Sequence, residues 1–311
     1  MNDEQNDVPE HVEQALNALA HSLNGGDADV LYCDICDGLR MRDHYCRCWL
    51  CSLPASECVC EQQTENTTMP DVQIGYVQGV LDLTATRFPT RAQLWQPQCG
   101  DDEHQRFEHD GDTLFGYVGG GVGCVLVSNA GRFWLKPGML FSSPTPCRLE
   151  AREGASVLLI QRIGWHGLFN VHGPVEAKGR LRYIDGCSDT VCINPPRVGD
   201  PCFNHLHFPA DITQTMHTHP SVRIGVVIAG RGHCVTPNGE FELQPGMLWY
   251  LPENQPHCFH TRGETLDVVA WHPDSDSGPS DENHPMLNRT LVDGVSAAAL
   301  PHIRTTGEIR E

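Results

Sequence analysis

Two short stretches decide the fold class, MHTHPSVR (216–223) and PGMLWYLPENQPH (245–257). Alternate residues of an extended strand share a face, so the first stretch places His217 and His219 side by side. The second stretch carries a proline-bounded turn and delivers a third histidine, His257. Neutral imidazole is a common protein ligand of iron, zinc, copper and nickel. The three histidines are therefore a candidate metal site.

The sequence around these stretches is typical of short β-strands. Apolar runs alternate with Gly, Pro and Asn turns after residue 70, and the chain holds 30 glycines and 22 prolines. This alternation of short apolar runs and turns indicates an all-β sandwich or barrel. The segment FWLKPGML, which begins at Phe133, returns as FELQPGML from Phe241, each time followed by a proline-bearing turn, a cysteine and an apolar strand. Repeats of this length indicate two copies of one β domain.

The histidine-bearing copy resembles the cupin superfamily, whose members are small barrels built as a double-stranded β-helix. The superfamily has an H-x-H motif followed by a glutamate and a glycine, and a second motif with P-x-G and a later histidine. The matching positions in this chain are His217, His219, Gly230, Pro245, Gly246 and His257. The resemblance covers 205–272 and implies an all-β chain of two tandem cupin barrels.

The chain departs from the cupin pattern in two places. Glycine follows proline directly at Gly246, and the motif glutamate falls at Arg223 or Ile224, neither of which is a carboxylate. The second departure resembles three-histidine cupins, among them iron-dependent dioxygenases. The resemblance implies Fe(II), or another divalent transition metal, at the three histidines. The first copy has no H-x-H, so we expect it to bind no metal.

Arg223 is expected to bind the substrate. By strand alternation it points into the barrel beside the metal, and a buried guanidinium needs an anionic partner. A substrate carboxylate held by two hydrogen bonds is one such partner. An internal salt bridge with Glu253 or Glu242 is the alternative. We expect the apolar lining of the pocket to come from Trp249, Tyr250 and Phe259.

A cysteine-rich run, CDICDGLRMRDHYCRCWLCSLPASECVC (33–60), predicts a structural zinc module. Two Cys-x2-Cys pairs resemble a zinc ribbon, in which four thiolates close a tetrahedral site. The candidate ligands are Cys33, Cys36, Cys46, Cys48, Cys51, Cys58 and Cys60. The four that share an ion cannot be chosen from the sequence, and redox sensing by these thiols is an alternative.

A chain of 311 residues is long enough for two domains and a small appendage. The expected segments are an N-terminal helix (1–30), the zinc module (31–60), a linker (61–70), a cupin-like barrel without metal (71–172), the metal-binding barrel (173–275) and a tail packed on the barrels (276–311).

The net charge of −19 disfavours nucleic acid as a partner. The chain has no apolar run long enough to cross a membrane and no secretory signal, so we expect a cytoplasmic protein. The zinc module favours a protein partner, and a homodimer stays possible.

These features predict a mononuclear metalloenzyme of the cupin type, an Fe(II)-dependent oxygenase that acts on a small organic acid. A cupin that senses a small molecule or binds a protein without catalysis is one alternative. A non-redox lyase or isomerase with another metal in the same pocket is a third reading.

Overall fold

The computed structural model describes residues 71–75, 79–97, 103–151 and 154–305, together with the backbone of a hairpin at 30–33 and 38–41. The chain divides into two compact units, Met1–Thr68 and Met69–Glu311. In the first unit, strands β1 (Val30–Cys33) and β2 (Gly38–Met41) pair antiparallel. The expected N-terminal helix, the linker and the side chains of the zinc-module cysteines lie outside the described residues.

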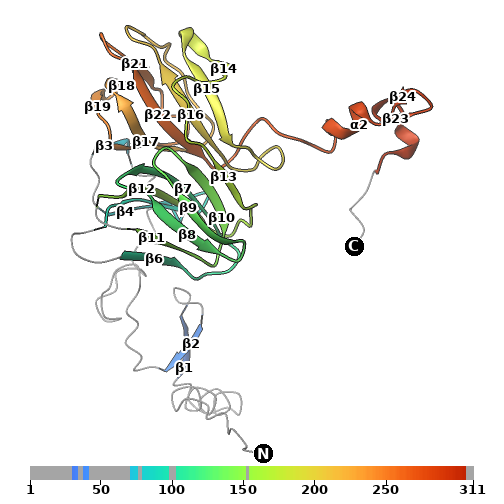
Figure 1. The fold of residues 1–311 in the computed structure, drawn as a ribbon, viewed down its shortest axis with the longest axis horizontal. Coiled ribbons are helices and arrows are strands. Elements are labelled where there is room, and N and C mark those ends of the chain that lie inside the picture. The colour runs from blue at the N-terminus through green and yellow to red at the C-terminus, as the bar shows by residue number, and fades with distance from the viewer. Residues whose placement is uncertain are drawn as a thin grey trace, which may run out of the picture. The chain divides into compact units, whose positions relative to one another are not determined.

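The second unit is almost entirely β, which confirms the all-β prediction (Figure 1). Its one described α-helix is the short α2 (Pro285–Arg289). Four of its sheets form two pairs, and each pair encloses an apolar core.

The first pair of sheets is built from residues 80–172. Its larger sheet has the order β13-β10-β7-β12-β5-β4 and its smaller sheet the order β6-β11-β8-β9. The strands are β4 (Val80–Asp82), β5 (Thr90–Trp95), β6 (Glu103–Phe107), β7 (Thr113–Gly120), β8 (Cys124–Ser128), β9 (Gly131–Leu135), β10 (Leu140–Pro144), β11 (Cys147–Ala151), β12 (Ser156–Arg162) and β13 (Asn170–His172). Alternating residues such as Leu126 and Leu149 bury their side chains between the sheets.

The second pair of sheets carries the three histidines. Its larger sheet has the order β14-β15-β16-β22-β17-β20-β3 and its smaller sheet the order β19-β18-β21. The strands are β3 (Gln73–Gly75), β14 (Leu181–Arg182), β15 (Ser188–Ile193), β16 (Cys202–Phe208), β17 (Arg223–Gly230), β18 (Gly232–Thr236), β19 (Gly239–Leu243), β20 (Leu248–Leu251), β21 (Cys258–His260) and β22 (Leu266–His272). A 3-10 turn, η3 (Ile184–Gly186), joins β14 to β15.

Strand β3 joins a sheet that is distant in sequence. It pairs with β20, so that Ile74 lies opposite Trp249, although the ten strands of the first pair of sheets lie between β3 and β14 in the chain. Residues 71–75 therefore contribute to the sheet that carries the site.

The two sequence copies pair their strands in the same way. Strand β10 pairs with β7 as β20 pairs with β17, and β8 pairs with β9 and β11 as β18 pairs with β19 and β21. The two larger sheets then pack face to face, because one buried cluster contains residues of both copies. Within it the rings of Phe115 and Trp271 lie 5.8 Å apart.

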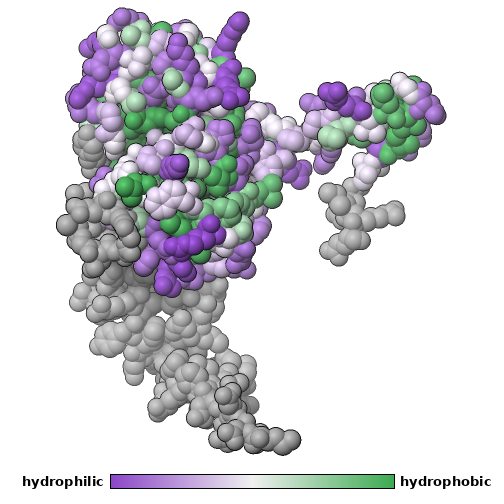
Figure 2. All heavy atoms as spheres, viewed as in Figure 1, coloured by the Kyte–Doolittle hydropathy of each residue, from purple (hydrophilic) through white to green (hydrophobic). Residues whose placement is uncertain are grey.

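The C-terminal segment is short and locally hydrogen-bonded. It contains α2, β23 (Leu291–Val292), β24 (Val295–Ser296), η4 (Ala297–Ala299) and η5 (Pro301–Ile303). Nearer the sheets, Val198 N–H donates to the carbonyl of Pro279. Figure 2 shows apolar residues gathered in this segment. Among its residues, Met286 and Leu291 are 67% and 64% exposed. No described helix has the length and apolar character needed to cross a membrane.

Candidate metal centre and its pocket

The backbone brings the three histidines together across two segments that are distant in sequence. His217 and His257 face each other and exchange two backbone hydrogen bonds, each of 2.9 Å. The carbonyl of His219 accepts from the N–H of Asn254 at 2.7 Å, which ties the second segment to the first. One ligand atom from each histidine lies within 4.8 Å of the others. The ring centroids are 4.6 to 5.1 Å apart.

Hydrogen bonds to carbonyls set the tautomers of two of these rings. The Nδ1 atom of His217 lies 2.8 Å from the carbonyl of Thr215, and the Nδ1 atom of His257 lies 2.8 Å from that of Gln255. A carbonyl oxygen only accepts, so each Nδ1 carries the proton. The lone pair of each Nε2 is then free for a metal, as in many histidine sites where a carbonyl orients the ligand.

The electrostatics of the site keep the imidazoles of His219 and His257 neutral. Burial, followed by the charge of Arg223, lowers the pKa of His219 from 6.5 to about 2. Burial, partly offset by the bond to Gln255, lowers the pKa of His257 to about 4. A histidine must be neutral to bind a metal, so this donor set fits a divalent transition metal. It contains no carboxylate.

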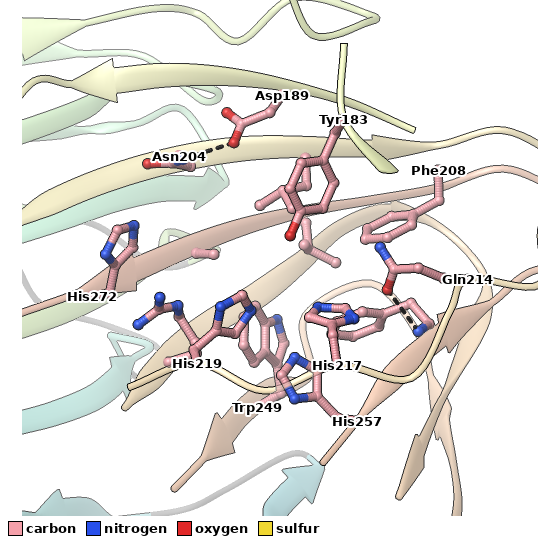
Figure 3. A pocket seen from close by; sticks show the side chains of 15 residues that line it. Tyr183, Asp189, Asn204, Phe208, Gln214, His217, His219, Trp249, His257 and His272 are labelled. Atoms are coloured by element: carbon pink, nitrogen blue, oxygen red, sulfur yellow. Dashed lines mark hydrogen bonds between the residues drawn. The ribbon is translucent and has the colours of Figure 1, made fainter. Parts of the chain in front are cut away.

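The histidines border a pocket of about 180 Å³ inside the second pair of sheets (Figure 3). Trp249 from β20 and Phe259 from β21 line it. Tyr250 does not, because it follows Trp249 on the same strand and turns into the core between the two larger sheets. The complete lining is Tyr183, Asp189, Asn204, Leu206, Phe208, Gln214, His217, His219, Arg223, Trp249, His257, Phe259, Val268, Ala270 and His272.

Arg223 lines the same pocket. Its Nη1 atom donates to the carbonyls of Ser221 and Val222 at 3.0 and 3.1 Å, and to the hydroxyl of Ser221 at 2.7 Å. That hydroxyl in turn donates to the carboxylate of Asp274. No described carboxylate forms an ion pair with Arg223, and Glu242, expected as an alternative partner, lies 3.6 Å from Arg231 instead. Arg223 therefore presents its positive charge to the pocket.

The comparisons with known proteins identify this part of the chain. The family model described as a cupin domain matches residues 205–272. Residues 205–272 match the cupin family. We call the second pair of sheets, which contains these residues, the cupin domain. The match includes His217, His219 and His257 and begins at His205 in β16. No protein with a curated description matches the chain.

Several solved structures are similar to the chain at low identity. A cupin 2 conserved barrel domain protein from Leptotrichia buccalis is 13% identical, with 67% of this chain and 92% of that chain covered and a TM-score of 0.47. A putative glyoxylate-induced protein from Pseudomonas aeruginosa is 14% identical, with 68% and 83% covered and a TM-score of 0.49. A salicylate 1,2-dioxygenase from Pseudaminobacter salicylatoxidans is 14% identical, with 60% and 70% covered and a TM-score of 0.44.

Sequence reasoning missed several polar residues of the cupin pocket. Figure 3 shows Asp189, Asn204 and His272 gathered on one side and Phe208 and Gln214 on the opposite side. No local motif marks the polar residues. For Asn204 and His272 the signal is position on a strand, because they occupy inward-facing positions of the paired strands β16 and β22. Gln214 lies between strands and has no such signal.

Two further histidines of the cupin domain, His205 and His207, point away from the pocket. They alternate with inward-facing Asn204 and Leu206 on β16. Nε2 of His205 and Nδ1 of His207 each lie 2.9 Å from the same carboxylate oxygen of Asp267. This pair belongs to the packing between the sheets and not to the three-histidine group.

Proposed function

We propose that the cupin domain is a mononuclear metalloenzyme, with Fe(II) held by His217, His219 and His257, that oxidises a small organic acid with dioxygen. One observation carries the proposal: three imidazoles converge on a small pocket that also contains an arginine paired with no described carboxylate. The pocket volume of about 180 Å³ fits a substrate of few atoms.

The donor set suits iron that must keep coordination positions open. Three protein ligands leave room for other molecules, whereas a closed site with four ligands does not. Bound ferrous iron would supply coordination sites for substrate and dioxygen and electron transfer between them.

Arg223 is placed to fix the orientation of the acid. Its guanidinium matches the geometry of a carboxylate, and burial makes such a charge-assisted pair stronger than it is in water. Phe208, Trp249 and Phe259 line the pocket with apolar rings, which would exclude bulk water from the reacting groups. The hydrogen bond from Arg223 to Ser221, and from Ser221 to Asp274, holds the guanidinium in place.

The metal content of the full chain, purified without oxygen, tests the proposal. We compare the wild type with His217→Ala and with His166→Ala, which removes an exposed histidine outside the pocket. We expect about one iron per chain in the wild type and the control, and loss of iron in His217→Ala. Zinc should be the same in all three, because we also propose a separate zinc site in the cysteine module.

Turnover distinguishes the proposal from its alternatives. Oxygen consumption with small carboxylic acids should occur in the wild type and disappear in His217→Ala. Zinc, nickel or manganese at the histidines, with acid conversion that consumes no oxygen, would replace the oxygenase with a lyase or isomerase. Zinc alone, unchanged in His217→Ala, would contradict a metal in the cupin domain and favour a sensing or interaction role.

A further inference from the structure

A second charged group, Asp189, lines the pocket of the cupin domain and is incompletely hydrogen-bonded. It lies on β15, next to β16. Its Oδ2 atom accepts from the side-chain amide of Asn204 at 2.8 Å, as Figure 3 shows. Its Oδ1 atom is buried and accepts a hydrogen bond from no described residue. A buried carboxylate oxygen without a donor is costly, and such an exception calls for an explanation.

The charges that surround the pocket do not neutralise Asp189. Arg223 lines the same pocket, but the two side chains form no ion pair, and the charge of Arg223 is opposed by Asp274 through Ser221. His205 lies on the other face of β16, where it pairs with Asp267. The pocket therefore presents one cation and one separate anion to the same small ligand.

We propose that Asp189 binds a protonated amino group, so that the ligand of this pocket is a small zwitterionic amino acid whose carboxylate pairs with Arg223. This inference rests on the proposed function and narrows its substrate class. The positive charge of Arg223 and the negative charge of Asp189 do not pair with each other. Together they complement a molecule that carries a carboxylate and an ammonium group. The volume of about 180 Å³ limits that molecule to a few heavy atoms beyond its charged groups, below the ~300 Å³ at which sites for drug-sized ligands begin.

Two other features agree with a cationic group at this place. Burial raises the pKa of Asp189 against the opposing effects of the hydrogen bond from Asn204 and of the charge of His205, so these two neighbours only partly compensate for the loss of water. In Figure 3 the hydroxyl of Tyr183 points into the pocket, between the side of Asp189 and the side of the histidines. The phenol oxygen can accept a hydrogen bond from the same ammonium group.

Calorimetric titration of the iron-loaded full chain, without oxygen, tests the inference. The probes are three matched pairs, glycine with acetate, β-alanine with propionate, and γ-aminobutyrate with butyrate. The members of each pair differ in the amino group alone. The wild type is compared with Asp189→Asn, which keeps the size of the side chain, and with Asp293→Asn, which neutralises an exposed aspartate of the C-terminal segment.

We expect at least one amino acid to bind about tenfold more tightly than its matched acid in the wild type and in Asp293→Asn, because charge-assisted hydrogen bonds are the strong ones. In Asp189→Asn the ratio should fall to about one, with the affinity for the plain acid and the iron content unchanged. Arg223→Gln should weaken both members of the pair.

Three results would overturn the inference. They are equal binding within all three pairs in the wild type, a preference for the amino acid that survives in Asp189→Asn, and no binding of any probe. If plain acids bind through Arg223 as tightly as their matched amino acids and iron is present, the inference fails and the proposed function stands. If iron is absent from the wild type, the proposed function fails as well.

Discussion

At the level of single residues, the replacement of a carboxylate by Arg223 changes the charge of the site. Imidazole ligands carry no negative charge, so they would leave the charge of a divalent metal uncompensated, and Arg223 adds another positive charge to the pocket. A site with this balance favours anionic ligands.

Gly225 creates the space in which Trp249 lies. A Cβ atom at this position would come closer to the backbone oxygen of Val269 and the indole of Trp249 than real Cβ atoms come to their neighbours. Gly225→Ala should therefore lower the free energy of unfolding by about 3 kcal/mol, since overpacked cores must shift backbone or leave their rotamers. Urea denaturation measures this change, with the exposed Ala229→Ser on the same strand as control. Equal stability of the two variants would contradict the packing described here.

The lowered pKa of the buried His272 ring should make the stability of the fold depend on pH. Burial, reinforced by Arg223, lowers its pKa to about 3, while the unfolded chain has the ordinary value of about 6.5. Between these two values the unfolded state binds the proton and the folded state does not, so stability is complete above pH 6.5 and falls as the pH drops. Protonation of this single group should lower the free energy of unfolding by about 2 kcal/mol between pH 7 and pH 5.

Urea denaturation of the metal-free protein at these two pH values tests the role of His272. The loss of stability on acidification should be smaller by about 2 kcal/mol in His272→Gln than in the wild type. The exposed His166→Gln should keep the wild-type loss. His219 and His257 contribute with the same sign in every variant. An unchanged loss in His272→Gln would show that this ring is not the group that titrates.

At the level of elements, β3 supports the strand that carries Trp249. Ile74 is half-buried against the core of the cupin domain, whereas Val80 on the next strand is 53% exposed. Ile74→Asp should lower the free energy of unfolding by about 2 kcal/mol, because a charge replaces apolar surface removed from water. Val80→Asp should change it by less than about 0.5 kcal/mol. Thermal denaturation of both variants decides whether β3 is a structural part of the cupin domain.

At the level of the whole molecule, the two larger sheets share one core. Phe115 belongs to the first copy and packs against Trp165 and against Trp271 of the cupin domain at 5.9 and 5.8 Å. Phe115→Ala should lower the free energy of unfolding by about 3–5 kcal/mol. Both pairs of sheets should still unfold in one transition, at a lower urea concentration than in the wild type. The exposed Trp134→Ala is the control for removal of an aromatic ring. Separate transitions for the two pairs of sheets would contradict a shared core.

The sequence allowed the local part of the site to be predicted well. The spacing of His217 and His219 and the turn before His257 follow from strand geometry, and the described structure brings these three rings together. Strand alternation also predicted that Arg223 faces the pocket, which it lines. The expected apolar lining was correct for Trp249 and Phe259 but not for Tyr250, because neighbouring residues of one strand cannot both face inward.

Periodicity and turns along the chain were enough to predict the all-β class and the grouping of the three histidines, because these signals act over a few residues. The tertiary structure alone decided that Asp189, Tyr183 and His272 join the histidines and that β3 completes the sheet of the cupin domain. These contacts depend on which distant strands pair and in which register. That choice is made by the burial of whole sheet faces, which no short stretch of sequence expresses.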